Sequence, residues 1–473
     1  MENKQPQAVI LSMTRDGEKL CAAGGRISTQ PGDAIEIWNH SQDEEKNSRL
    51  IQKVTRSGHN SVVEHVCFHL AFQNVSVMVE QFMIEFRLAS FTVKSRRYVD
   101  FSSAGYYMPE GLDDALTQTY TTHMEALFAD YQYLIEHDVP KEDARFVLPY
   151  CFCSNFYCTL NGRELLHVLH AMLCGRGSRF PEIVLIGRQL LEQARAMAPG
   201  VFAAFEEGQA SVADSLDLSD LPSLPEGAHV LPHGYQFAEL LAATPDAAKC
   251  VARTALIEGT QLPGDEINKV LSDAKIRAEI LRRVIASSRP RALENISFTF
   301  RLNGVSLPCI THIVRHRMQS VMIPPLTETD RTHKIIPPSI RKQSDCLARY
   351  EAAFHRNAAL YQKLHGEGVS KETLVYFLLS GNTLDVVTTM NARELLLFLR
   401  LRTCSRAQWE IHIYADEMLR LLREKEPELF RFFGPSCFVT GKCPEGRLSC
   451  GNMQEVCARY QLEGEKKRPV ENA

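Results

Sequence analysis

TLNGRELL at residues 159–166 returns as TMNARELL at residues 389–396, which sets an offset of 230 residues between two parts of the chain. The same offset takes RLAS at residues 87–90 onto RMQS at residues 317–320. An offset that holds over so long a stretch predicts a duplicated domain, because chance matches would not keep one register. Comparing the two copies then shows which polar residues each copy has kept and which it has lost.

The composition is typical of a soluble globular protein. The 473 residues suit two or three domains, and 45% of them are hydrophobic and 23% charged. No run approaches the roughly 20 apolar residues that cross a bilayer, and the first residues lack the pattern of a signal peptide. We therefore expect no membrane partner and a cytoplasmic location. The formal net charge of −4 argues against nucleic acid as a partner, although a local arginine cluster can still hold a small anion.

Four segments follow from the repeat and from the turn-forming residues. Residues 1–213 form the first copy, residues 214–232 a linker rich in Ser, Asp and Pro, residues 233–433 the second copy, and residues 434–473 a tail with cysteines. Within each copy, alternating apolar residues predict strands, and apolar residues three and four apart predict long helices. Since strands and helices are mixed without strict alternation, the expected class is α+β, with an antiparallel or mixed sheet in each copy.

These patterns also predict where the main elements lie. The strands are expected at residues 8–13, 66–75 and 296–305, and the last two are expected to turn at Gln73-Asn74 and Asn303-Gly304. The long helices are expected at residues 162–174, 181–197, 392–404 and 408–424.

The second copy carries the sharpest cluster of cationic side chains, Arg315-His316-Arg317. Two guanidinium groups beside an imidazole can hold a phosphate or a carbonyl-rich ring by paired hydrogen bonds. A solvated basic turn at a helix end is the competing interpretation. The first copy has Glu85-Phe86-Arg87 at the matching position, so it keeps only the last arginine.

Anion-binding residues are divided between the copies. The first copy carries Ser95 and Arg97, which would face one side of an extended segment and form a phosphate clamp, and it also carries Arg145. The residues that replace these three in the second copy cannot clamp an anion, whereas the second copy gains an arginine of its own. Position by position, the exchanges are Ser95 to Pro325, Arg97 to Thr327, Arg145 to Val375 and Met172 to Arg402.

Two further groups of residues give weaker signals. GHNSVVEH at residues 58–65 contains histidines, a serine and a glutamate, which suit ligand binding, although such residues at a helix start are more often caps or satisfied structural groups. In the tail, five and six residues separate Cys437, Cys443 and Cys450, with Cys457 beyond. Zinc or an iron–sulfur cluster is conceivable there, but the tight Cys-x-x-Cys spacing is missing, so we expect free thiols and no metal.

Together these motifs resemble the flavin-dependent thymidylate synthases, in tandem and over nearly the whole chain. The family signature is Arg-His-Arg, then Ser eight residues after the last arginine, then x-Arg-Tyr. The second copy has the first part at Arg315-His316-Arg317, and the first copy has the last part at Ser95-x-Arg97-Tyr98. Further stretches similar to the family are residues 58–65, 142–149, 391–396 and 407–411.

The resemblance implies synthesis of dTMP from dUMP, with methylenetetrahydrofolate as carbon donor, FAD as redox carrier and NADPH as reductant. The family uses no protein nucleophile, so its side chains place the reactants and stabilise charge. It implies that Ser95, Arg97 and Arg145 bind the nucleotide, and that Arg315 and Arg402 face the pyrimidine as catalytic residues. The implied flavin contacts are His59, Ser61, Glu64, His316, Arg317, Asn391 and Arg393.

The family builds each site from several subunits of a homotetramer. We therefore expect one composite site, made by the clamp of the first copy and the arginines of the second, in a homodimer of the fused chain. Departures from the family pattern leave two alternatives: a nucleotide- or flavin-binding pseudoenzyme, and a flavoprotein acting on another pyrimidine nucleotide. The family's Asn-Glu within the signature is Thr92-Val93 in one copy and Met322-Ile323 in the other, and its glutamine before Arg-His-Arg is Phe82 in one copy and His312 in the other.

Overall fold

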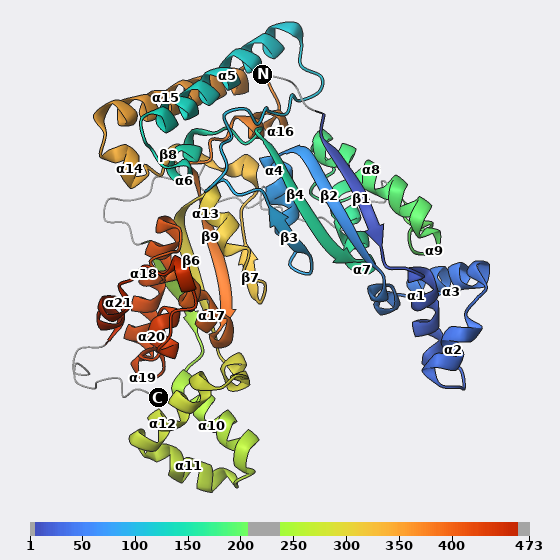
Figure 1. Cartoon of the computed structure of the whole chain (residues 1–473), viewed down its shortest axis with the longest axis vertical. Helices are drawn as coiled ribbons and strands as arrows, with labels where there is room; N and C mark the ends of the chain where they lie inside the picture. Colours follow the sequence, from blue (N-terminus) through green and yellow to red (C-terminus); the bar gives the residue numbers. More distant parts are fainter. Residues whose placement is uncertain (1–4, 207–236, 462–473) are drawn as a thin grey trace, which may run out of the picture. The chain divides into compact units, whose positions relative to one another are not determined.

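The computed structural model describes residues 5–206 and 237–461 of the chain (Figure 1). The predicted linker at residues 214–232 lies outside them. Packing divides the described part into two compact units: unit 1 contains residues 5–206 and Lys334–Asn382, and unit 2 contains residues 237–333 and 383–461. The units differ from the two sequence copies, because Lys334–Asn382 belongs to the second copy and packs with the first.

Unit 1 is built on a four-stranded antiparallel sheet in the order β1-β2-β4-β3. Its strands are β1 (Gln7–Met13), β2 (Cys67–Ser76), β3 (Ser90–Val93) and β4 (Cys153–Asn161). Alternate side chains such as Phe68 and Phe156 are buried on one face, where Phe68 meets Phe202 edge to face at 5.6 Å. The alternation that predicted half-buried strands is therefore confirmed.

Helices cover the buried face of this sheet and extend from its ends. Near the sheet lie α4 (Val77–Ile84), α7 (Gly162–Leu173), α8 (Pro181–Met197) and α9 (Pro199–Phe202), with α8 along β1. After β1 come α1 (Gly17–Ile27), α2 (Ala34–His40), α3 (Glu44–Arg56) and η1 (Asn60–His65). The long α5 (Asp114–Glu136) and α15 (Ser344–Gly366) lie side by side (Figure 1). The remaining helices of unit 1 are α6 (Lys141–Ala144), η2 (Arg145–Val147), α14 (Pro338–Arg341), α16 (Lys371–Leu374) and η5 (Val375–Phe377).

Unit 2 repeats this plan on a sheet in the order β5-β6-β9-β7, with β8 also pairing with β9. The strands are β5 (Ala238–Ala243), β6 (Ser297–Ser306), β7 (Gln319–Met322), β8 (Asp330–Lys334) and β9 (Asn382–Asn391). The helices matching the first copy are α10 (Ala247–Thr260), α11 (Gly264–Ser272), α12 (Ala274–Ala286), η3 (Arg291–Asn295), α13 (Leu307–Ile313), α17 (Ala392–Arg402), α18 (Trp409–Lys425) and α19 (Pro427–Phe430). The additional helices are η4 (Leu326–Glu328), α20 (Ser436–Thr440), η6 (Gly446–Leu448) and α21 (Met453–Tyr460).

The duplication extends to backbone detail. Asp16 and Asp246 both adopt the left-handed conformation before the first helix of their copy, with φ of 53° and 48°. The offset of 230 holds up to α7 and α17, and then falls to 228, because α8 begins at Pro181 and α18 at Trp409. The connection before this last long helix is thus two residues shorter in the second copy.

Two sequence predictions need correction at the bulges of the central strands. The strands do not turn at Gln73-Asn74 and Asn303-Gly304, because β2 and β6 run on to Ser76 and Ser306 through a register shift. Asn74 and Gly304 absorb this shift with φ of 53° and 61°. The α+β class is confirmed, and no helix in the described ranges is long and apolar enough to span a membrane.

Candidate functional site

The Arg-His-Arg motif of unit 2 follows α13. This helix begins where the Ser306 side chain accepts the Cys309 N–H at 3.2 Å, and it ends at Ile313. The chain then turns, and the His316 N–H donates to the Ile313 carbonyl at 3.1 Å. The His316 ring is buried, whereas Arg315 lies at an exposed position. A solvated basic turn therefore does not describe the histidine.

Arg402 at the end of α17 reaches this turn. Its Nε donates to His316 Nε2 at 3.0 Å, and its Nη2 donates to the His312 carbonyl at 3.1 Å. On the other side of the ring, His316 Nδ1 lies 2.9 Å from Glu394 Oε1. The structure thus joins His316 and Arg402, which come from two separate motifs, in one hydrogen-bonded group.

The surroundings of His316 keep its ring neutral. Burial lowers the pKa of His316 below its ordinary value, and the charges of Arg402 and Arg315 lower it further, while Glu394 opposes them. The ring also meets Phe398 edge to face at 4.8 Å. A neutral imidazole can accept the hydrogen bond from Arg402 Nε, and this contact orients the guanidinium group.

Two residues outside the predicted site, Glu394 and Gln319, hold this group in place. Glu394 stands in the repeated stretch, but its partner His316 is 78 residues away and cannot be identified from local sequence. Gln319 donates to the Ile313 carbonyl at 2.6 Å and accepts the Thr388 hydroxyl at 2.7 Å, so it ties the turn to β9. The sequence signal for Gln319 is the repeat of RLAS as RMQS, in which Gln319 stands at the position of Ala89.

In unit 1, the three residues predicted to bind phosphate gather around Glu142. Arg97 Nε donates to Glu142 Oε2 at 2.5 Å, and Arg145 Nε donates to the Glu142 carbonyl at 2.9 Å. Ser95 is next to them, because its hydroxyl accepts the Arg97 N–H at 3.3 Å. The set can bind an anion that competes with the Glu142 carboxylate for Arg97.

The backbone of this clamp differs from the prediction of an extended segment. Ser95 opens a turn, since its carbonyl accepts the N–H groups of Tyr98 and Val99 at 3.4 and 3.0 Å. The Ser95 hydroxyl accepts the Arg97 N–H within this turn. The spacing of Ser95 and Arg97 in the sequence does not predict this turn. The neighbouring Arg96 has a structural partner, because it donates to the buried Glu80 at 2.6 Å.

The residues implied in flavin contact fall at matching places in both units. Glu64 in η1 pairs with Arg163 at 2.6 Å in unit 1, and Glu294 in η3 pairs with Arg393 in unit 2. Asn391 caps α17 by accepting the Glu394 N–H at 2.9 Å. The other implied contacts, His59, Ser61 and Arg317, lie at exposed positions. Exposed guanidinium, imidazole and hydroxyl donors suit the phosphates and carbonyls of a dinucleotide.

The first copy has a different network where the second has its histidine and arginine. Phe86 occupies the position of His316 and packs edge to face on His167 at 5.2 Å. Glu85 occupies the position of Arg315 and accepts from Arg176 at 2.6 Å. The two units therefore carry different polar groups, with Ser95, Arg97 and Arg145 around Glu142 in unit 1 and the His316–Arg402 group in unit 2.

Comparison with known proteins matches both halves of the chain to one family. Residues 9–200 and 239–428 each match the family described as thymidylate synthase complementing protein. The flavin-dependent thymidylate synthase of Geobacter sulfurreducens is 35% identical over 221 residues, which cover 46% of this chain and 94% of that protein. The enzyme of the same name from Clostridium tetani is 34% identical over 240 residues, covering 47% of this chain and 96% of that protein. Among solved structures, the UMP/dUMP methylase PolB of Streptomyces cacaoi, bound with 5-Br dUMP, matches 43% of this chain and 96% of its own at 22% identity, with a TM-score of 0.37.

Proposed function

Because the chain belongs to the family of thymidylate synthase complementing proteins, we propose that it is a flavin-dependent thymidylate synthase. It would convert dUMP to dTMP, with methylenetetrahydrofolate as carbon donor, NADPH as reductant and FAD as redox cofactor. Two relatives named flavin-dependent thymidylate synthase match about half of this chain over nearly their whole length, which supports the proposal.

The hydrogen-bonded group of His316 and Arg402 carries this proposal. Arg402 is held by His316 and by the His312 carbonyl, so its guanidinium is oriented before substrate arrives. An oriented cation stabilises negative charge that develops on a pyrimidine carbonyl without the cost of reorganisation. We assign Arg402 and Arg315 to the pyrimidine.

The nucleotide phosphate would be bound by the first copy. Ser95, Arg97 and Arg145 already lie around Glu142, and a phosphate would replace that carboxylate as the partner of Arg97. We infer one composite site per chain, since neither copy has both the phosphate-binding set and the pyrimidine-facing arginines. A homodimer of the fused chain would then supply the four domains that the single-domain family obtains from four subunits.

The flavin would be held by His59, Ser61 and Glu64 from unit 1 and by residues of unit 2. Those of unit 2 are His316, Arg317, Asn391 and Arg393. When bound, FAD supplies the hydride for the pyrimidine ring, and the side chains supply orientation and charge. The matched pair Arg393 and Arg163 offers a test, because substitution of the cofactor-binding arginine should lower the flavin content more than substitution of its counterpart.

A second candidate is a flavoprotein that acts on another pyrimidine nucleotide. It is favoured by the missing carboxylate, since Thr92 and Val93 stand at that place on β3, and Met322 and Ile323 replace them in the second copy. Without this carboxylate, the site loses one acceptor for a sugar hydroxyl or ring N–H group.

The decisive experiment is a flavin and product assay on the purified full-length protein. We expect bound flavin visible by absorbance, and dTMP from dUMP when methylenetetrahydrofolate and NADPH are added. Arg402→Lys keeps the charge but loses the Nε donor, so we expect it to form less dTMP while binding flavin. A colourless protein that fails to rescue a thymidine auxotroph would instead support a nucleotide-binding pseudoenzyme. Turnover of a different pyrimidine nucleotide would support the second candidate.

A further inference from the structure

The end of α17 in unit 2 carries Arg402, and side chains from outside the helix bind its last carbonyl groups. The final carbonyls of a helix have no N–H partner within it, so they need other donors. Three side chains supply hydrogen bonds here: Ser436 to the Arg400 carbonyl at 3.3 Å, His412 Nδ1 to the Arg402 carbonyl at 3.1 Å, and Tyr460 to the Thr403 carbonyl at 3.1 Å. Ser436 and Tyr460 lie beyond residue 428, where the match to the family ends.

The first copy closes the same helix end with its own backbone. After α7, the Gly175 N–H donates to the His170 carbonyl at 2.9 Å. The Gly177 N–H donates to the Ala171 carbonyl at 2.9 Å, and a Cβ at Gly177 would lie 2.9 Å from that oxygen, so this approach requires glycine. The shorter connection of the second copy, residues 403–408, contains no glycine. The C-terminal residues therefore supply donors that the first copy obtains from its loop.

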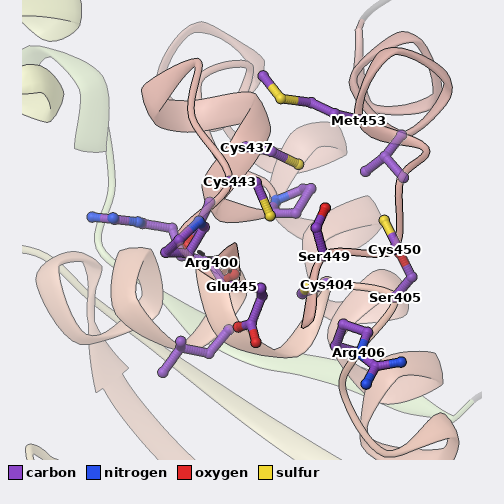
Figure 2. Close-up of a pocket in the computed structure, with 15 residues that line it drawn as sticks. Arg400, Cys404, Ser405, Arg406, Cys437, Cys443, Glu445, Ser449, Cys450 and Met453 are labelled. Carbon is purple, nitrogen blue, oxygen red and sulfur yellow. Dashed lines mark hydrogen bonds between the residues drawn. The ribbon is translucent and has the colours of Figure 1, made fainter. Parts of the chain in front are cut away.

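Residues 434–461, which we call the C-terminal strap, pack closely on this helix end. The strap contains α20 and α21, and α20 contacts α17. Figure 2 shows Arg400 and Cys404 of the helix end and Cys437 and Cys450 of the strap around one pocket. The enclosed cavity is about 30 Å³, room for only one or two waters, so little space separates the strap from α17.

Tyr460 also reaches Arg402 by a second route, through α18. Tyr460 is buried, and its hydroxyl lies 2.5 Å from Asp416 Oδ1, so its proton is shared between this carboxylate and the Thr403 carbonyl. Asp416 Oδ2 lies 3.4 Å from Nε2 of His412, the residue that donates to the Arg402 carbonyl. The Tyr460 hydroxyl thus contacts both the carbonyl that follows Arg402 and the carboxylate beside His412.

Two arginines hold α21, which carries Tyr460, against α18. Arg423 Nη2 donates to the Tyr460 carbonyl at 2.8 Å and to the Phe433 carbonyl at 2.9 Å, so it binds the chain just before the strap and near its end. Arg459 forms an ion pair with Asp416. These contacts fix the backbone of Tyr460 and, with it, the position of the hydroxyl.

We propose that the C-terminal strap positions Arg402, with Tyr460 as the positioning residue. This inference rests on the proposed function, in which Arg402 stabilises charge on the pyrimidine. His316 and the His312 carbonyl hold the guanidinium, while His412 and the strap hold the backbone from which it extends. Both are needed, because a misplacement of about 1 Å in an active site can cost about 100-fold in rate.

Tyr460→Phe removes the hydroxyl and keeps the ring, and Tyr414→Phe is its matched control. Tyr414 is also buried in unit 2, but its hydroxyl donates to the Asn303 carbonyl of β6 at 2.7 Å. The first measurement on the full-length protein needs no turnover: phenylglyoxal modifies arginine side chains, and mass spectrometry of peptides gives the rate at Arg402. We expect Tyr460→Phe to raise this rate about fivefold, as loss of one hydrogen bond would, and Tyr414→Phe to leave it unchanged.

The second measurement is dTMP formation by the full-length, flavin-loaded protein. We expect Tyr460→Phe to lower kcat about tenfold with little change in KM for dUMP, since the charge that Arg402 stabilises develops only in the transition state. The flavin content of both variants and the kinetics of Tyr414→Phe should match the wild type.

An equal modification rate of Arg402 in Tyr460→Phe and Tyr414→Phe would overturn the proposal, whether or not the wild type forms dTMP. Faster modification with an unchanged kcat would also overturn it, because the strap would then hold the arginine without serving the reaction. A wild type that forms no dTMP but shows the expected modification rates would contradict the proposed function and support the fixing of Arg402 by the strap. If Tyr460→Phe does not fold, Asp416→Asn decides instead, since it weakens the contacts of Tyr460 and His412 and should change both measurements in the same direction.

Discussion

Arg402 Nε donates to His316 Nε2 at 3.0 Å, and this contact decides which nitrogen of the ring carries the proton. Since Nε2 accepts, the proton of the neutral ring is on Nδ1, where it is donated to Glu394 Oε1 at 2.9 Å. The two hydrogen bonds therefore run in one direction, from Arg402 to His316 and from His316 to Glu394. They orient the guanidinium that we assign to the pyrimidine.

The buried neutral state of His316 predicts a loss of stability in mild acid. Burial and the charges of Arg402 and Arg315 lower its pKa in the folded protein. The imidazole of the unfolded chain is therefore protonated near pH 6.5, whereas the folded ring stays neutral at that pH. The free energy of unfolding should fall as pH drops from 6.5 to the folded pKa, and His316 should have no such effect above 6.5. Urea unfolding at pH 7.5 and 5.5 should show a smaller pH dependence for His316→Gln than for the wild type.

His65→Gln, at an exposed position of η1, controls for the general effect of losing an imidazole. An equal pH dependence in the wild type and His316→Gln would mean that folding does not lower the pKa of His316.

The composite site predicts how two inactive variants behave when mixed. Arg97→Ala would lose the proposed phosphate contact and Arg402→Ala the proposed pyrimidine contact, so each should reduce dTMP formation by about 100-fold or more. If the two residues serve one site within a chain, a mixture of the two variants should stay inactive. Wild type mixed with the double variant is the control for subunit exchange. Partial recovery of turnover in the mixture, from heterodimers that each hold one intact site, would show that each site uses residues from two chains.

Local pattern was sufficient for the strands and the long helices. Alternation predicted β2 and β6 because every second side chain packs on helices, and apolar spacing predicted α8 at its observed bounds, Pro181–Met197. The repeat supplied the pairing of elements between copies. Turn-forming residues occur at bulges as well as at turns, so the sequence predicts turns where the structure has bulges at Asn74 and Gly304.

Motifs were enough to choose candidate site residues, but not to identify the side chains that contact them. Arg97, His316 and Arg402 could be chosen from motifs, whereas Glu142 and Glu394 are their partners only through packing. Local sequence contains no signal for such contacts, because the partners lie tens of residues apart. For the same reason, the packing of α15 with the first copy could not be inferred from the second copy's own sequence.

A buried carboxylate in unit 1 predicts an opposite pH effect to that of His316. Glu182 accepts the Ser76 N–H at 2.7 Å, the Ser76 hydroxyl at 2.6 Å and the Tyr376 hydroxyl at 2.9 Å. Burial raises the pKa of Glu182 to about 7, although these hydrogen bonds lower it in part. The folded state thus holds a proton that the unfolded chain releases near pH 4.5. The contribution of Glu182 to the free energy of unfolding is complete below pH 4.5 and is lost as the pH rises to about 7.

Tyr376→Phe tests this carboxylate through the hydroxyl that the second copy supplies. It removes a donor to an ionised group, so it should cost about 1–3 kcal/mol at pH 8 and less at pH 5, where Glu182 is protonated. Unfolding in urea at both values measures the difference, and Tyr133→Phe on α5, at a partly exposed position, is the control. An equal loss at the two pH values would mean that Glu182 does not change its charge between them.

Asp130 predicts how strongly α5 and α15 are held together in unit 1. Its carboxylate is buried and accepts from both Arg349 and Arg356, and the equivalent residue of the second copy is Leu360. Asp130→Asn should destabilise unit 1 by about 1–3 kcal/mol, because it weakens two charged hydrogen bonds at once. Either arginine replaced by glutamine should cost less, because the other arginine still neutralises the carboxylate.

Replacing both arginines should have the largest effect of the series. The double variant leaves Asp130 as a buried charge without its partners, a change that costs about 3–5 kcal/mol in protein interiors. The partly exposed arginines place the expected value at the lower end of that range. Urea unfolding of the four variants gives the order directly. If Asp130→Asn were the more damaging change, the carboxylate would contribute through contacts other than those with its two arginines.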